Sequence, residues 1–286
     1  MTRISFEFFP PHDMDGAFRL SRAVAHLAPY APDFASVTYG AGGTTRQNTH
    51  DAVQAIGKTY GLNVAAHLTC VDATREQTLQ IAQDYAQAGV TQIVALRGDP
   101  AGGAANFVAH EDGFSSSVDL IRALADMGEF DIRVAAYPDV HPEAANASAD
   151  LDWLKAKIDA GATSAITQFF FEAETFLRFR DQCAAAGISI PILPGILPVT
   201  NWSKIRDFAR RCGTRISANV EEGWARALRD GHQDLYALTQ CTTLCTALLE
   251  EGVDHLHFFT LNRPERTCEV LAALGVTPVE QDLAVA

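Results

Sequence analysis

Short hydrophobic runs alternate with longer amphipathic or alanine-rich runs along the whole chain. Leu151, Leu154 and Ile158, for example, stand at helical spacing behind Ser148, a residue type that commonly caps a helix. Glycines repeatedly separate such a run from the next hydrophobic one, as helix-terminating glycines do. The pattern predicts eight strands alternating with helices, over residues 4–9, 34–39, 63–70, 92–98, 131–137, 165–171, 190–197 and 255–261.

Strict alternation of strands and helices implies a parallel sheet, because a crossover helix returns the chain to the same end of the sheet. Eight such units in 286 residues predict an α/β fold, a single catalytic (β/α)₈ TIM barrel domain over residues 1–286. A doubly wound open sheet is the alternative. Two segments, 100–113 and 216–234, exceed ordinary connections and are expected to be loops that serve as lids or oligomer contacts.

The first predicted strand places a single carboxylate among hydrophobic residues. Ile4, Phe6 and Phe8 occupy one face, and Glu7 lies on the other between Ser5 and Phe9. Loss of water disfavours a charged carboxylate, so this setting is expected to raise the pKa of Glu7 towards that of a general acid. Pairing with an arginine elsewhere in the core is the structural alternative.

Polar residues recur near the carboxyl ends of the predicted strands, which is where barrel enzymes carry their chemistry. Along the fourth strand, alternation places Val94 and Leu96 outward, with Ala95, Arg97 and Asp99 towards the barrel axis. Six polar strand ends at matching heights predict a pocket. These ends carry Glu7, Thr38, His67, Arg97 with Asp99, Tyr137 and Gln168.

Two further patterns leave alternatives open. The glycine-rich turn at residues 40–45 is suited to a phosphate, but it matches neither a dinucleotide nor a nucleotide triphosphate fingerprint, so an ordinary turn is equally plausible. His255 and His257 would suit a metal-dependent barrel hydrolase, but they stand near the amino end of their strand, away from the expected pocket. We therefore favour a structural role for the two histidines and predict no metal.

Composition narrows the possible partners. The chain carries 22 basic and 35 acidic residues, a net charge of -13, which argues against nucleic acid and anionic membranes as partners. Its apolar runs are all shorter than the roughly 18 residues that span a membrane. The six cysteines form no Cys-x-x-Cys pair. Together with the absence of a leader pattern before the first strand, these features predict a cytoplasmic protein with reduced thiols.

Ten sequence motifs, in their order along the chain, resemble methylenetetrahydrofolate reductase of the short bacterial type. They are SFEFFPP at 5–11, SVTYG at 36–40, HLTC at 67–70, ALRGD at 95–99, AAYP at 135–138, HPE at 141–143, DAGA at 159–162, ITQFFF at 166–171, PGILP at 194–198 and FTLNR at 259–263. The resemblance implies a barrel that binds FAD and takes electrons from NADH or NADPH. It also implies reduction of 5,10-methylenetetrahydrofolate to 5-methyltetrahydrofolate by a ping-pong scheme, and a homo-oligomer.

The resemblance also assigns roles to residues. Glu7 matches the general acid that protonates the folate and opens its five-membered ring to an iminium ion, and Asp99 matches a carboxylate near the flavin and pterin. Folate contacts are implied for Gln168, Phe208 and Arg263, together with Glu7. The positions that match flavin contacts are Thr38, His67, Arg97, Gly98, Asp99, Ala135, Tyr137, His141, Asp150 and Lys157.

Four positions depart from the family pattern. Ser116 stands where a tyrosine is common, Trp153 and Ala156 replace polar or basic flavin contacts, and Lys204 replaces a glutamine that can contact folate. We therefore expect FAD to be held more weakly than in relatives. A flavin-free reductase, with hydride passing directly from NADH or NADPH to the folate, is the alternative that these departures leave open.

Overall fold

The computed structural model describes residues 2–39, 46–99 and 107–279. The strands are β1 (Arg3–Phe8), β2 (Phe34–Val37), β3 (Val64–Thr69), β4 (Gln92–Leu96), β5 (Asp131–Ala136), β6 (Ser164–Thr167), β7 (Ile192–Leu193), β8 (Gly195–Ile196) and β9 (His255–Phe259). The helices are α1 (Met14–Leu27), a 3₁₀ turn (Ala28–Tyr30), α2 (Arg46–Tyr60), α3 (Arg75–Gln87), α4 (Ser117–Met127), α5 (Ala147–Asp159), α6 (Ala173–Ala185), α7 (Trp202–Cys212), α8 (Ala218–Asp230), α9 (Gln233–Glu250) and α10 (Pro264–Ala273).

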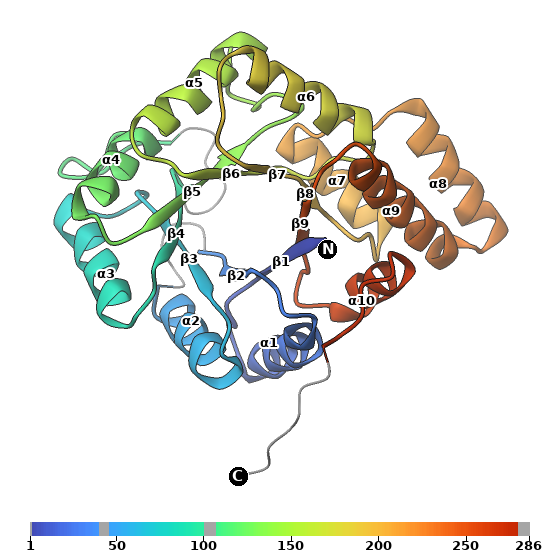
Figure 1. Cartoon of the computed structure of the whole chain (residues 1–286), viewed down its shortest axis with the longest axis horizontal. Coiled ribbons are helices and arrows are strands. Elements are labelled where there is room, and N and C mark those ends of the chain that lie inside the picture. Colours follow the sequence, from blue (N-terminus) through green and yellow to red (C-terminus); the bar gives the residue numbers. More distant parts are fainter. Residues whose placement is uncertain (1, 40–45, 100–106, 280–286) are drawn as a thin grey trace.

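All strand pairs are parallel, in the order β7-β6-β5-β4-β3-β2-β1-β9-β8. The sheet forms a nearly closed barrel with the helices in an outer ring (Figure 1). β1 and β9, from opposite ends of the chain, lie side by side, with Glu7 level with Phe259. The predicted (β/α)₈ barrel is therefore confirmed, and the open doubly wound sheet is not formed.

The predicted seventh strand is divided in two. β7 pairs with β6, and β8 pairs with β9, with Pro194 between them. Proline has no N–H to donate, so it interrupts the ladder at this point. Because β7 pairs with β6 and β8 pairs with β9, these two short strands bring the β6 and β9 sides of the sheet close together.

The segment at 216–234 is helical, so the prediction of a long loop there was wrong. Ser217 caps α8 by accepting a hydrogen bond from the backbone N–H of Val220 at 3.3 Å. Val220, Trp224 and Ala227 form its buried face, at a spacing of four and three residues. α5 also begins earlier than expected, because Asn146 and not Ser148 caps it. The turn at 40–45 and residues 100–106 lie outside the described residues.

Two hydrophobic layers meet at the sheet. Residues such as Ile4, Phe6 and Ala95 belong to the large layer between strands and helices. A small cluster fills the barrel interior, made of Phe34, Ala65, Val94, Ile166 and Leu193. The predicted orientation of β4 was wrong, because Val94 points inward and Ala95 outward. Strands buried on both faces are apolar throughout, so alternation does not distinguish the faces.

Among the described residues no helix is long and apolar enough to cross a membrane.

Candidate active site

Glu7 lies inside the barrel, where three neighbouring strands direct polar side chains at its carboxylate. Its Oε2 lies 3.3 Å from Nε2 of His67 on β3 and 3.8 Å from Nε2 of His257 on β9. The hydroxyl of Ser36 on β2 donates to the same oxygen at 3.4 Å. The Glu7 side chain is 15% exposed, and His257 is fully enclosed. The carboxylate is therefore flanked by two imidazoles, of which His67 is the nearer.

The two histidines reverse the expected shift in the pKa of Glu7. Burial favours the neutral acid, but the adjacent imidazoles of His257 and His67 favour the carboxylate, outweigh burial and lower the pKa to about 2. The prediction of a raised pKa was therefore wrong for the ligand-free protein. Burial lowers the pKa of His257 in turn, although the adjacent Glu7 carboxylate opposes this change.

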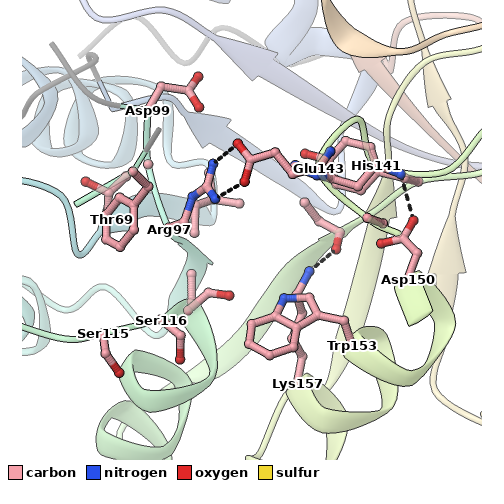
Figure 2. A pocket seen from close by; sticks show the side chains of 18 of the residues that line it. Thr69, Arg97, Asp99, Ser115, Ser116, His141, Glu143, Asp150, Trp153 and Lys157 are labelled. Atoms are coloured by element: carbon pink, nitrogen blue, oxygen red, sulfur yellow. Dashed lines mark hydrogen bonds and ion pairs between the residues drawn. The ribbon is translucent and has the colours of Figure 1, made fainter. Parts of the chain in front are cut away.

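A cavity of about 570 Å³, here called the carboxyl-end pocket, opens at the carboxyl ends of β3, β4 and β5. Figure 2 shows side chains from these strands and from the starts of α4 and α5 turned towards it. Among the residues that line it are Tyr39, Thr69, Ala95, Leu96, Arg97, Gly98, Asp99, Phe107, Ser115, Ser116, Ser117, Ala135, Tyr137, His141, Glu143, Ala144, Ala149, Asp150, Trp153 and Lys157.

The guanidinium of Arg97 is held across this pocket by two hydrogen bonds. Its Nη1 and Nη2 donate to the two carboxylate oxygens of Glu143 at 2.5 and 2.9 Å (Figure 2). The guanidinium also lies 5.2 Å from the centre of the Phe107 ring. Glu143 thereby balances the charge of Arg97 and fixes the plane of the guanidinium at the wall of the pocket, where a phosphate could take the place of the carboxylate.

Lys157 provides a second cation, buried at the floor of the pocket. Its Nζ donates to the carbonyl of Ala135 at 2.8 Å, and no carboxylate in the described part of the chain forms an ion pair with it. Burial lowers the pKa of Lys157 to about 8, although Asp150 favours the charged form. One turn earlier on α5, Trp153 is 44% exposed and lies beside Lys157 in Figure 2.

The pocket also contains an unused hydrogen-bonding group and a close backbone approach. The hydroxyl of Thr69 is buried without a hydrogen-bond partner among the described residues, an arrangement that costs free energy unless a ligand satisfies it. Gly98 has a φ of 84°, and a Cβ there would lie 2.8 Å from side-chain atoms of Thr69 and Val71. Two cations, an exposed indole and an unpartnered hydroxyl fit an anion that carries a planar ring.

Comparison with known proteins identifies the family of this chain. The family model described as methylenetetrahydrofolate reductase matches residues 1–275. The chain belongs to the methylenetetrahydrofolate reductase family. It is 44% identical to the 5,10-methylenetetrahydrofolate reductases of Pectobacterium carotovorum and Escherichia coli, over 96% of this chain and 91% of each relative. It is 33% identical to methylenetetrahydrofolate reductase (NADH) 1 of Arabidopsis thaliana, over 96% of this chain and 48% of that protein.

A solved structure shares the fold. It is an uncharacterised protein from Clostridium thermocellum described as binding two copies of 5-methyl-5,6,7,8-tetrahydrofolic acid. The TM-score is 0.58 at 15% identity, with 95% of this chain and 93% of the other covered. At this identity the likeness supports the barrel alone.

Most residues that the family resemblance assigns to the flavin converge on the carboxyl-end pocket. Arg97, Gly98, Asp99, Ala135, Tyr137, His141, Asp150 and Lys157 all line it. His67 and Thr38 do not belong to its lining. His67 faces Glu7 instead, and the backbone N–H of Thr38 donates to the carbonyl of Phe8.

None of the predicted folate residues, Glu7 included, belongs to this lining. Gln168 follows β6, and its side-chain oxygen accepts a hydrogen bond from the N–H of Phe169 at 3.0 Å. Phe208 on α7 stacks on the ring of Phe169, with centroids 5.5 Å apart. Arg263 is exposed at the start of α10. Their roles in reductase chemistry remain predictions.

The structure adds residues that the sequence did not single out. Glu143 pairs with Arg97, and Thr69 faces the pocket. His257 contacts Glu7, so its predicted position away from the site was wrong. Its strand pairs with β1 across the closure of the barrel, and a spacing of 250 residues gives no sequence signal for that contact. Ser116 caps α4, which is a structural use of that position.

Proposed function

We propose that this protein reduces 5,10-methylenetetrahydrofolate to 5-methyltetrahydrofolate, with FAD in the carboxyl-end pocket and NADH or NADPH as electron donor. The observation that carries the proposal is Glu7, a buried carboxylate between two histidines, in the same barrel as a pocket that fits an anionic planar ligand. Membership of the reductase family supports the same reaction. One barrel would carry both half-reactions in turn, a ping-pong scheme.

FAD would supply the hydride transfer between nicotinamide and folate. Arg97 and Lys157 would neutralise its diphosphate on a protein whose net charge is -13. The hydroxyl of Thr69 would gain a partner, and the indole of Trp153 offers a ring face to a planar group. The remaining family contacts at this cofactor stay predictions, Thr38 and His67 included.

Glu7 would protonate the folate so that its five-membered ring opens to an iminium ion. In the ligand-free protein a pKa of about 2 keeps Glu7 ionised at neutral pH, so its proton must come from neighbouring groups. His67 and His257 are placed to hand one over. Folate binding would remove water above the carboxylate, and this further desolvation favours the neutral acid.

The other folate contacts would position the substrate rather than move protons. Asp99 at the pocket rim would stabilise the cationic iminium through its negative charge. Gln168 would meet the pterin amide, Phe208 would pack on the substrate, and Arg263 would bind the glutamate tail. Assembly as a homo-oligomer and a cytoplasmic location remain predictions from the sequence.

Two alternatives lead to different observations. A flavin-free reductase remains consistent with Ser116, Trp153 and Ala156 at positions where relatives contact flavin. A metal-dependent hydrolase is not favoured, because the described residues contain no cluster of three or more metal-ligating side chains. The proposed flavin-dependent reductase and the flavin-free reductase differ in whether the purified protein binds FAD.

The test is a visible spectrum of the FAD-loaded protein, with Glu7→Gln as the variant. NADH should bleach the flavin band of both proteins at similar rates. Methylenetetrahydrofolate should restore the band in wild type, and about 10²–10⁴ times more slowly in the variant, which is the usual contribution of a general acid. Glu129→Gln, an exposed position, serves as the control.

Three outcomes would contradict parts of the proposal. Equal loss of both half-reactions in folded Glu7→Gln protein would remove its role as the acid. NADH consumption that requires folate in protein that binds no FAD would select the flavin-free reductase. No response of wild type to methylenetetrahydrofolate would overturn the proposed function itself.

A further inference from the structure

A column of buried polar side chains runs from Glu7 towards the opposite end of the barrel. Nδ1 of His257 lies 2.8 Å from Oγ of Ser5, and the same oxygen lies 2.9 Å from Nε2 of His255. Nδ1 of His255 lies 3.7 Å from Oδ2 of Asp33. Ser5 and His257 are completely buried, and His255 is 6% exposed. The column between the carboxylates of Glu7 and Asp33 therefore consists of the imidazole of His257, the hydroxyl of Ser5 and the imidazole of His255.

The far end of this column opens into a second cavity of about 750 Å³, here called the amino-end cavity. It is lined by residues at the amino ends of the strands, including Arg3, Asp33, Gln92, Arg133 and His255. The Asp33 side chain is 33% exposed, so the column ends at a group that solvent reaches. This cavity lies at the other end of the barrel from the carboxyl-end pocket.

The reaction under "Proposed function" consumes one proton per turnover, because the folate gains a hydride and a proton. Cofactor and substrate would cover the carboxyl-end approach to Glu7 during this step. We propose that the amino-end cavity is the proton port of the enzyme, with His255, oriented by Asp33, passing protons through Ser5 and His257 to Glu7. The inference rests on the proposed function and adds His255 and Asp33 as positioning residues for it.

Each transfer balances along the column. Glu7 takes the proton on Nε2 of His257, and Nδ1 of His257 takes the hydroxyl proton of Ser5. Ser5 takes the proton on Nε2 of His255, and Nδ1 of His255 takes a proton from a water molecule that enters the amino-end cavity beside Asp33. The net change is one proton moved from solvent to Glu7. Return of the imidazoles to their starting tautomers resets the column.

The groups around His255 favour its neutral form, which a relay requires. Arg3 on β1, Arg133 on β5 and His257 oppose a positive charge on it, and Asp33 favours one. Burial dominates and lowers its pKa to about 4. A neutral imidazole has one donor and one acceptor nitrogen, so it receives a proton on one side while releasing one on the other.

The decisive experiment removes the imidazole of His255 and supplies one from solution. In FAD-loaded His255→Ala protein, NADH should bleach the flavin at the wild-type rate. The return of the flavin band with methylenetetrahydrofolate should slow at least tenfold, with a larger solvent deuterium isotope effect. Imidazole and its methyl derivatives should restore this rate in an order that follows their pKa values, as proton transfer predicts.

Two further variants separate proton transfer from packing. Thr163→Val changes the lining of the same cavity outside the column and should behave as wild type. His255→Gln keeps a donor and an acceptor beside Ser5 but does not take up a proton, so it should show the same slow step without rescue. It also serves if His255→Ala does not fold.

The proposal is overturned if His255 variants return the flavin band at the wild-type rate, or if both half-reactions slow equally. Rescue that follows the size of the azole and not its pKa would equally assign His255 a packing role. A wild-type protein that does not respond to methylenetetrahydrofolate would be a failure of the proposed function instead, and it would be seen before any variant is made.

Discussion

The two ends of the barrel interior differ in how their charges are compensated. At the amino end Arg3 pairs with Asp33 at 2.6 Å, and the lining of that cavity contains three arginines and three aspartates. At the carboxyl end Lys157 has only a carbonyl as its partner among the described residues. An uncompensated buried cation favours an anionic ligand, whereas a balanced set of charges favours water. This difference supports the proposal of a ligand site at the carboxyl end and a solvent port at the amino end.

The largest effect on this difference between the two ends is expected from removing the positive charge of Lys157. Lys157→Met keeps the length of the side chain, and loss of a charge-assisted contact of about 2 kcal/mol should raise the Kd for FAD about 30-fold. Because a buried charge without an ionic partner is also removed, the free energy of unfolding of the ligand-free protein should rise by about 2 kcal/mol. Titration calorimetry and urea unfolding measure the two effects.

Lys155→Met is the matched control, because Lys155 lies two residues away on α5 and is exposed. It should change neither quantity. A similar loss of FAD affinity in both variants would show that the general field of the protein, and not the buried position of Lys157, attracts the ligand.

Raising the pH above 8 should weaken FAD binding and, at the same time, increase the free energy of unfolding. Above pH 8 Lys157 loses its proton in the folded protein, so FAD affinity should fall by up to about tenfold per pH unit. Over the same range the unfolded chain still holds that proton, because its lysine titrates near 10.5. The free energy of unfolding should therefore gain about 3 kcal/mol from this residue between pH 8 and 10.5.

Both quantities are measured as differences between wild type and Lys157→Met, which cancels other titrating groups such as Tyr137. The differences should be flat below pH 7. A difference in FAD affinity that does not change between pH 7 and 10 would show that Lys157 does not meet the anion.

The sequence predicts much of the fold and several residues of the carboxyl-end pocket, and the features that it does not predict have physical causes. Alternation of strands and helices predicted the barrel, and the positions of Arg97 and Lys157 agreed with the family pattern. The inward direction of Val94 was missed because both faces of a buried parallel strand are apolar. α8 was missed because its apolar stripe, which contains Trp224, is narrow within a charged segment.

The pKa of Glu7 shows most clearly what the sequence alone does not determine. Burial alone predicts a raised pKa for Glu7, but the direction of the shift depends on His67 and His257, which the fold places next to the carboxylate. The contact with His257 forms across the closure of the barrel, between β1 and β9. Contacts that a fold makes by closing on itself leave no local pattern in the chain.

The smallest expected effect on FAD affinity concerns Trp153, whose exposed indole lines the carboxyl-end pocket and has no counterpart in the amino-end cavity. Trp202 and Trp224 are buried and stack on each other with centroids 4.7 Å apart, so acrylamide quenching of tryptophan fluorescence reports chiefly on Trp153. Bound FAD should lower the quenching constant by about half or more. Because ring stacking contributes about 0.5–1.5 kcal/mol, Trp153→Leu should weaken FAD binding about three- to tenfold.

Trp153→Phe should retain most of the affinity, because it keeps a ring face of similar orientation. An unchanged quenching constant in FAD-saturated protein would show that the indole stays in solvent, and the family departure at this position would then weaken FAD retention as the sequence predicted. Protection of the indole would instead show that this chain replaces the ring it lacks at Ser116 with one on α5. The carboxyl-end pocket would then bind its ligand through both buried charge and an exposed ring, and the amino-end cavity has no tryptophan in its lining to match it.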